Sequence, residues 1–345
     1  MNRHSECCCF IVPSRLLRHY ANKAATDAER DALLDAVELS AHLRGQRSVA
    51  PVNSISSLQT GEKRRTVYDA GHKTRLPGKL VRGEGSAPVA DKSVNQAYDS
   101  AGTTYDFYNQ VMHRNSIDGK GLRIDSSVHY SVKYNNAFWN GQQMVYGDGD
   151  GKLFLGFTSA LDVVAHELTH GVTQYTVPGG LTYEDQSGAL NESISDSLGI
   201  CCKQWFLKQT AAQADWLIGA GIMGAGAGKA LRSMSDPGNK SLTWEGDDQP
   251  GTMAGYVQGG DVHTNSGIPN HAFCLAAKGL GGSSWEKAGP IWYKALPLLT
   301  PNATFAEAAG ATIQAAKLLF GAAEVAAVTK AWKDVGVDAA DIARV

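Results

Sequence analysis

The sequence predicts an α+β fold with a β-rich N-terminal lobe and an α-helical C-terminal lobe, preceded by a short helical segment. Two observations carry this prediction. Between residues 63 and 156, apolar and polar residues alternate with a period of two in Thr66–Ala70 and Ser127–Tyr134, which is typical of half-buried strands. From Leu161 onward apolar residues recur at helical spacing, and an Ala-rich stretch spans residues 304–331.

Residues 10–43 predict one or two helices. Thr26 or Asp27 is a suitable N-cap, and an apolar stripe follows it. So small a helical piece buries little surface by itself, so we expect it to pack on the rest of the chain. The polar, Ser-rich residues 45–61 are interpreted as an exposed linker and a candidate cleavage site.

The β-rich half contains one predicted helix and one notable turn. Residues 91–111 have helical spacing. Asp148-Gly149-Asp150-Gly151 predicts a turn and is a weak calcium-loop signal, because the other ligand positions of an EF-hand are missing.

Composition limits the classes of function. The 345 residues carry a formal net charge of −2 and 43% hydrophobic residues, which is ordinary for a globular protein of two or three packed units. Neither nucleic acid nor a membrane is an expected partner, because there is no large charge excess and no apolar run long enough to span a bilayer. Before Pro13 there is no apolar segment of signal-peptide length, so we expect a cytoplasmic protein, with export by a route without a signal peptide as the alternative.

The six cysteines do not predict a disulfide framework, because five of them are adjacent in sequence. Cys201, Cys202 and Cys274 lie among apolar residues and are interpreted as small core residues. Reduced thiols are expected throughout.

Where the two halves join, residues 163–172 read Val-Val-Ala-His-Glu-Leu-Thr-His-Gly-Val. A helix places His166 and His170, four residues apart, on one face, so both imidazoles can bind one Zn²⁺. Glu167 then lies beside the metal-bound water. The alternative is a pair of hydrogen-bonded histidines on a buried helix.

A third metal ligand is expected downstream, because a catalytic zinc has three protein ligands and one open position. Glu192 and Asp196 share one face of a predicted helix. We expect Glu192 to bind the metal and Asp196 to accept the far N–H of a ligating histidine. A strong helix stop at residues 177–180 lets the two helices turn toward each other. The alternative for the two carboxylates is a solvated helix face.

These motifs, with several others, resemble those of the thermolysin-like zinc metalloproteases, and more closely the protealysin-like branch with a short propeptide. The matching stretches follow the family's order over most of residues 66–345; they are residues 135–149, 166–170, 188–196, 231–237 and 262–270.

The resemblance implies a zinc-dependent endopeptidase with a thermolysin-like fold, in which the zinc helix lies between the lobes. His166, His170 and Glu192 resemble the zinc ligands, and Glu167 the general base. Tyr183 and His263 match the residues that hydrogen-bond the oxyanion.

Several further residues match the substrate-binding residues of the family. Asn136 and the Ala137 backbone match the groups that hold the peptide main chain, and Arg232 matches the arginine that binds the carbonyl next to the scissile bond. The implied pocket selects a bulky apolar residue after the cleaved bond; core packing is the alternative role for its wall residues, Phe154, Phe157, Val163, Ile218 and Leu231.

Two departures from the family pattern affect function. The family's Asp five residues before His263 is replaced by Gln258, so either Gln258 orients His263 more weakly or Asp261 has taken over. At the family's double calcium site only Asp162 and Asp215 remain. The family's other three carboxylates are replaced by Lys203, Leu217 and Ala220. We expect no calcium there, because Lys203 can neutralise both remaining carboxylates.

The resemblance also implies a self-inhibited precursor, with a propeptide at residues 1–50, a β-rich lobe with the zinc helix at 51–180 and a helical lobe at 181–345. Peptide or protein substrates and the propeptide itself are the expected partners of a monomer. The triplet Cys7, Cys8 and Cys9 is either a set of exposed thiols without a task or a source of an inhibitory zinc ligand. The Phe-Ile-Val-Pro segment after it resembles the one by which such propeptides bind their catalytic domain.

Two other classes of function stay open. A silent zinc-binding or peptide-binding scaffold would not need Glu167, Tyr183 and His263. An exopeptidase would need a group that captures a substrate terminus, and no motif for one is present.

Overall fold

The computed structural model describes residues 9–47 and 62–341. Its β-rich lobe is built on a mixed sheet in the order β1-β5-β6-β4-β2-β3. Strands β2, β4 and β6 run parallel, whereas β1 and β3 form antiparallel edges. The predicted strand at 66–70 is confirmed, and the strands are β1 (Cys9–Phe10), β2 (Arg65–Asp69), β3 (Lys79–Gly83), β4 (Ile124–Val128), β5 (Ala137–Trp139) and β6 (Met144–Tyr146).

The strand predicted at 127–134 is wrong beyond Val128. His129, Ser131 and Lys133 have left-handed φ angles of 53°, 58° and 51°, which no β-strand accommodates. The alternating pattern instead reflects a kinked segment that buries Tyr130. Val132, at the next alternating position, is 70% exposed, so the alternation in the sequence does not correspond to one buried face.

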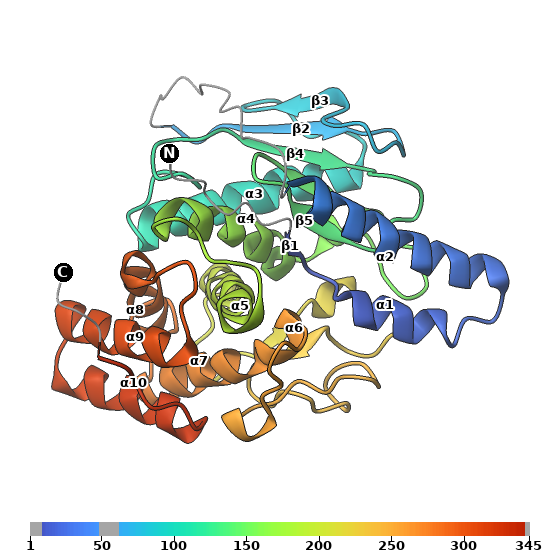
Figure 1. The fold of residues 1–345 in the computed structure, drawn as a ribbon. Helices are drawn as coiled ribbons and strands as arrows, with labels where there is room; N and C mark the ends of the chain where they lie inside the picture. The colour runs from blue at the N-terminus through green and yellow to red at the C-terminus, as the bar shows by residue number, and fades with distance from the viewer. Residues whose placement is uncertain (1–8, 48–61, 342–345) are drawn as a thin grey trace.

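Two long helices lie beneath the sheet, and a third passes through the centre of the molecule (Figure 1). Helix α3 (Lys92–Val111) begins at its N-cap Asp91, whose Oδ1 accepts the N–H of Val94 at 3.2 Å. Helices α4 (Leu161–Thr176) and α5 (Asp185–Leu207) pack against each other. The helix predicted at 91–111 is confirmed, and the buried contact of α4 with α5 is where the histidine motif and Glu192 meet.

The second lobe is helical, as predicted, apart from the short strands β7 (Leu217–Ile218) and β8 (Arg232–Ser233). Its core includes Trp292 and Trp332, which stack with ring centroids 6.1 Å apart. The helices are α6 (Val262–Asn265), α7 (Gly267–Leu280), α8 (Ala288–Ala295), α9 (Phe305–Leu319) and α10 (Ala322–Asp334).

The N-terminal segment forms β1, α1 (Ser14–Ala21) and α2 (Asp27–Arg47) and packs on both lobes (Figure 1). It adds β1 to the edge of the sheet beside β5. On the β-lobe, Lys152 Nζ lies 2.6 Å from Glu29 Oε1. On the other lobe, the Arg15 guanidinium lies over the Trp244 ring, 5.3 Å from its centroid. The expectation that this segment packs on the rest of the chain is confirmed.

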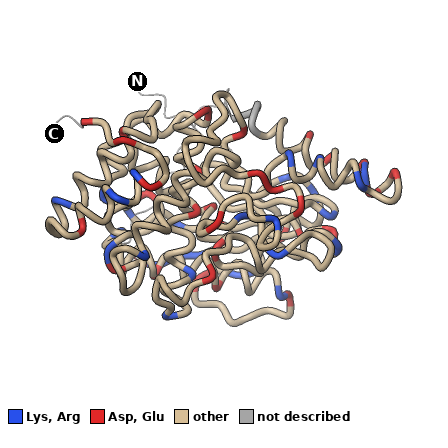
Figure 2. The backbone as a smooth tube through the Cα atoms, turned by 90° about the horizontal axis from the view of Figure 1, so that it is seen from below, with Lys and Arg blue, Asp and Glu red and all other residues tan. Residues whose placement is uncertain are grey.

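Charges of both signs are interspersed along the backbone when the molecule is seen from below (Figure 2). Among the described residues, the helices are too short or too polar to cross a bilayer.

Candidate active site

Helix α4 brings the two motif histidines together. His166 Nε2 and His170 Nε2 lie 3.0 Å apart, and both side chains are almost fully buried. Glu192 on α5 faces this pair, with Oε2 3.5 Å from His166 Nε2 and Oε1 3.5 Å from His170 Nε2. Two imidazoles and one carboxylate are a donor set that suits catalytic zinc. Glu192 Oε2 is buried without a hydrogen-bond partner, as expected for an atom that binds a cation.

A buried network holds the ligands in place. His166 Nδ1 lies 2.8 Å from Asp196 Oδ1, and Asp196 accepts two hydrogen bonds from Arg232 and one from Asn270, each at 2.8 Å. Burial opposes ionisation of Asp196, but Arg232 and His166 more than offset it and hold the pKa of this carboxyl well below its usual range. The expected contact of Asp196 with a ligating histidine is present. Arg232 was predicted to bind substrate, and its hydrogen bonds to Asp196 were not predicted.

The sequence analysis missed the partner of the other histidine. His170 Nδ1 lies 2.8 Å from Asn191 Oδ1. Asn191 and Asn270 are 4% and 0% exposed. The sequence does contain a signal for this partner, namely an amide side chain within a helix that is predicted to be apolar. A buried polar side chain needs a hydrogen-bond partner, so such an amide is a candidate.

Glu167 is fully buried beside the ligand set. Its Oε2 accepts the backbone N–H of Trp139 at 2.9 Å, and Oε1 is buried without a partner. Burial, opposed by His166 and reinforced by Glu192, raises the pKa of Glu167 well above its ordinary value. A carboxyl in this environment has the proton affinity that a general base needs near neutral pH.

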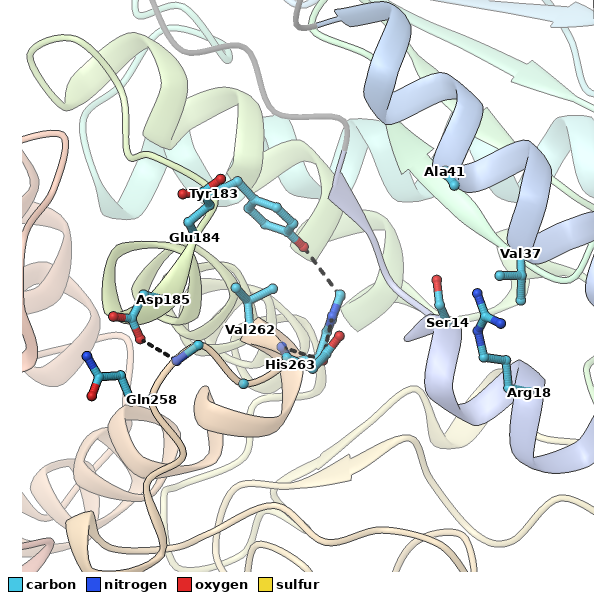
Figure 3. Close-up of a pocket in the computed structure, with 13 residues that line it drawn as sticks. Ser14, Arg18, Val37, Ala41, Tyr183, Glu184, Asp185, Gln258, Val262 and His263 are labelled. Carbon is cyan, nitrogen blue, oxygen red and sulfur yellow. Dashed lines mark hydrogen bonds and ion pairs between the residues drawn. The ribbon is translucent and has the colours of Figure 1, made fainter.

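Tyr183 and His263 point toward each other on one side of the ligands (Figure 3), with Tyr183 Oη 3.4 Å from His263 Nε2. The Tyr183 hydroxyl donates to Glu192, and His263 Nε2 lies 3.4 Å from Glu192 Oε2. Burial opposes protonation of His263, but Glu192 and Asp261 more than offset it and raise its pKa. Two proton donors therefore flank the predicted metal position.

Asp261, rather than Gln258, is the neighbour of His263. Asp261 Oδ1 lies 3.3 Å from His263 Nδ1 and also accepts the backbone N–H of His263 at 3.0 Å. Figure 3 shows the Gln258 side chain near Asp185 and away from His263.

The N-terminal strand lies in this site as a peptide chain. Val12 N–H donates to Asn136 Oδ1 at 3.0 Å, and Asn136 Nδ2 donates to the Val12 carbonyl at 3.1 Å. Ile11 N–H donates to the Ala137 carbonyl at 3.3 Å. The two residues expected to hold a peptide main chain therefore hold the chain's own N-terminal segment.

The carbonyl groups of the same strand meet the remaining predicted donors. Arg232 Nη1 donates to the Ile11 carbonyl at 3.1 Å, and His263 Nε2 lies 2.8 Å from the Phe10 carbonyl oxygen. The Ile11 backbone N–H, which donates to the Ala137 carbonyl, also lies near enough to Glu167 to oppose the rise in the pKa of that carboxyl. The Phe10–Ile11 peptide bond therefore has its oxygen at His263 and its nitrogen near Glu167.

The predicted wall residues of the apolar pocket are all buried. Each is at most 1% exposed and belongs to the apolar cluster that also contains Ile11; they are Phe154, Phe157, Val163, Ile218 and Leu231.

Cys9 reaches the metal-ligand set. Its sulfur, a nitrogen of His170 and a carboxylate oxygen of Glu192 all lie within 4.8 Å of one another. Cys9 is disulfide-bonded, so the expectation of reduced thiols throughout is wrong for this residue. Cys7 and Cys8 lie outside the described residues. The expected core cysteines are free and buried, namely Cys201, Cys202 and Cys274.

At the position of the family's double calcium site, Lys203 Nζ lies 3.5 Å from Asp162 Oδ2, 3.4 Å from Asp215 Oδ1 and 3.2 Å from the Leu217 carbonyl oxygen. Asp162 Oδ2 also accepts the Gly219 N–H at 3.0 Å. Ala220 has no side-chain oxygen that could bind calcium. The Lys203 ammonium group lies between the two remaining carboxylates.

A cavity of about 640 Å³ remains between the N-terminal segment and the helical lobe (Figure 3). Tyr183 and His263 form part of its lining, and Ser14 and Arg18 of α1 face them. The N-terminal segment therefore leaves part of the cleft beside the site open.

Comparisons with known proteins agree with this geometry. Residues 44–174 match the family model described as thermolysin metallopeptidase, catalytic domain, and residues 179–337 match the one for the alpha-helical domain. An extracellular metalloprotease of Pectobacterium carotovorum subsp. carotovorum is 51% identical over 290 residues, which cover 81% of this chain and 83% of the relative. Protease PrtS of Photorhabdus sp. (strain Az29) is 40% identical over 343 residues, covering 95% and 91%.

A solved structure is also similar over nearly its whole length. The precursor of protealysin, a metalloproteinase from Serratia proteamaculans, superposes with a TM-score of 0.85 at 46% identity, covering 95% of this chain and 99% of that one.

Proposed function

This chain belongs to the thermolysin family of metallopeptidases and is a zinc-dependent endopeptidase made as a precursor with a propeptide, and from this premise we propose which of its residues perform the hydrolysis. The observation that carries the proposal is the Phe10–Ile11 peptide bond, which lies between His263 and Glu167. His166, His170 and Glu192 are the zinc ligands. Zinc supplies Lewis acidity toward a substrate carbonyl and toward water.

Glu167 is the general base. Its carboxylate removes a proton from the attacking water and delivers it to the leaving nitrogen, the atom that Ile11 N occupies in this structure. Retention of this carboxyl in a buried position argues against a scaffold that only binds zinc or peptides.

His263 and Tyr183 stabilise the oxyanion. His263 Nε2 already donates to a peptide carbonyl, that of Phe10, and Tyr183 Oη lies 3.4 Å from the same nitrogen. Donors placed in advance lower the barrier because they need no reorganisation as charge develops. Asp261 is a positioning residue, which holds the His263 ring through Nδ1.

Asn136, Ala137 and Arg232 hold substrates as an antiparallel strand, in the way they hold residues 11 and 12. The residue after the cleaved bond then takes the place of Ile11, which is fully buried in an apolar cluster. We therefore expect cleavage on the N-terminal side of bulky apolar residues. No group that would capture a substrate terminus is found among the residues that contact this strand, which favours an endopeptidase.

The propeptide inhibits by occupying the substrate position. In the reduced chain, the Cys9 thiol would add a second restraint, because a thiolate binds zinc more tightly than water does. The disulfide at Cys9 would withhold that ligand, so this restraint depends on the redox state.

Calcium has no role at the Asp162–Asp215 position. A calcium site needs six to eight oxygen ligands, and the Lys203 ammonium already neutralises these carboxylates.

We also propose that the propeptide ends near residue 50, that the two lobes meet near residue 180, and that the enzyme is a monomer. Synthesis in the cytoplasm stays a prediction. The Pectobacterium relative is named extracellular, which favours export of this chain as well.

The central test is hydrolysis of a quenched-fluorescence peptide with an internal Leu or Ile, using enzyme from which the propeptide has been removed. A zinc chelator should abolish cleavage, and added zinc should restore it. Cleavage only at a substrate terminus, or activity that persists without metal, would contradict the proposal.

A further inference from the structure

We infer that His72, His129 and Asp148 form a second metal site, on the β-rich lobe, that takes zinc or another late first-row divalent ion. Their candidate ligand atoms all lie within 4.8 Å of one another. His129 Nδ1 is 2.8 Å from Asp148 Oδ1, and His72 Nδ1 is 3.4 Å from Asp148 Oδ2. One nitrogen of each ring therefore converges on the same carboxylate.

The topology of the sheet brings the two histidines together. Strands β2 and β4 are parallel neighbours, with Asp69 paired to Val128 (Figure 1). The segments that follow them therefore leave the sheet side by side. His72 N–H donates to the His129 carbonyl at 2.9 Å, so the backbones that carry the two rings are bonded directly to each other.

Both histidines have left-handed backbones, with φ of 58° at His72 and 53° at His129. Such conformations persist in non-glycine residues when the surroundings fix them. The hydrogen bond from Ser131 N–H to the Lys73 carbonyl, at 3.1 Å, fixes the pair a second time. The backbone positions that carry the two rings are therefore set before any ion binds.

Asp91 completes the arrangement of a metal-binding histidine. Its Oδ2 lies 2.8 Å from His129 Nε2, while its Oδ1 caps helix α3. A carboxylate that accepts the far N–H of a histidine orients the ring and makes its other nitrogen a better ligand. His129 thus has one nitrogen held by Asp91 and the other directed at the proposed ion.

The donor set indicates which ions fit. Two imidazoles with one carboxylate suit zinc, copper or nickel, whereas calcium and magnesium prefer all-oxygen ligands. Asp91 and Asp148 bring two carboxylates to the histidines, and a divalent ion would offset their negative charge. The His72 side chain is 58% exposed, so an ion can arrive from solvent and keep water as a further ligand.

A proton is the competitor for this position. Each ring nitrogen of His129 lies 2.8 Å from a carboxylate oxygen, of Asp91 or of Asp148, and this arrangement also suits a proton on both nitrogens. The charged and titratable groups around the ring are Asp91, Asp148 and His72. An ion must displace the proton, so binding should be tighter at pH 8 than at pH 6.

The test uses full-length Glu167→Ala protein, which cannot digest itself, with one equivalent of zinc bound at the His166–His170–Glu192 set. Isothermal titration at pH 8 should reveal a second zinc per chain. At zinc 100-fold above the dissociation constant, the melting temperature should rise by roughly 4 °C. The additional His72→Asn change should abolish both effects, because asparagine tolerates the left-handed backbone but cannot replace the imidazole.

His113→Asn is the matched control, because His113 is also exposed and left-handed, with φ of 52°, and should leave both effects intact. Copper added to the zinc-loaded protein should give an electron paramagnetic resonance spectrum with two nitrogen ligands. The proposal is overturned if only one zinc binds up to millimolar concentration, or if the second zinc persists in the His72→Asn protein.

Discussion

His263 Nε2 lies 2.8 Å from the carbonyl oxygen of Phe10, across 253 residues of sequence. The nitrogen assigned to the oxyanion is therefore bound to a carbonyl of the chain itself. The propeptide therefore places one of its own carbonyl groups where the proposed oxyanion donor binds.

Removing the general base should separate metal binding from catalysis. The Glu167→Ala protein, with its propeptide removed in trans, should keep one tightly bound zinc and lose at least about 10²–10⁴-fold in kcat. Metal analysis and a peptide assay on the same preparation check this. Near-normal turnover by the zinc-loaded variant would show that Glu167 is not the base.

The two carboxylates of α5 should differ in what they support. Glu192→Gln should lose zinc affinity, because it removes a ligand charge. Asp196→Asn should keep most of its zinc but lose about 10–100-fold in affinity or activity, because it weakens the contact with His166 Nδ1. Full zinc in Glu192→Gln with none in Asp196→Asn would reverse the two assignments.

A charge at the buried position 11 of the propeptide should release the enzyme. Ile11→Asp places a carboxylate at a fully buried position of the precursor. The uncut variant should therefore hydrolyse a small peptide substrate faster than the uncut parent does. Ala32→Asp puts the same side chain at an exposed position of α2 and should leave latency unchanged. Equal latency in all three proteins would mean that residue 11 does not hold the propeptide in the cleft.

Calcium should contribute little to stability, whereas Lys203 should contribute measurably. Lys203→Met leaves Asp162, which is 2% exposed, without its cation and should lower the free energy of unfolding by about 1–3 kcal/mol. Denaturant unfolding in an inactive background measures this loss. A large rise of melting temperature with calcium that disappears in an Asp162→Asn variant would contradict the assignment.

Cys9 should bind the metal only when reduced. In the reduced, uncut precursor loaded with cobalt in place of zinc, a sulfur-to-cobalt charge-transfer band should appear in the near ultraviolet. Cys9→Ser should remove that band, whereas Cys7→Ser combined with Cys8→Ser should retain it. A band that survives in Cys9→Ser, or is missing from the reduced parent, would exclude Cys9 as a ligand.

The sequence by itself determined the parts of the site that depend on local geometry. A helical repeat of 3.6 residues places His166 and His170 on one face, and the same rule places Glu192 and Asp196 together. The helix predicted at 91–111 is likewise local, whereas the linker predicted at 45–61 lies almost wholly outside the described residues. The alternation at 127–134 misled because left-handed residues at 129, 131 and 133 end the strand, so that Tyr130 is buried while Val132 is exposed.

Only the tertiary structure decided which distant groups meet. The contacts of Arg232 with Asp196, of Asn270 with the same carboxylate and of Phe10 with His263 join residues 36, 74 and 253 positions apart. No sequence period connects such positions, because the packing of β8 and α7 against α5, and of the N-terminal strand on β5, sets their separation. The same holds for His72 and His129, which the parallel pairing of β2 with β4 places side by side.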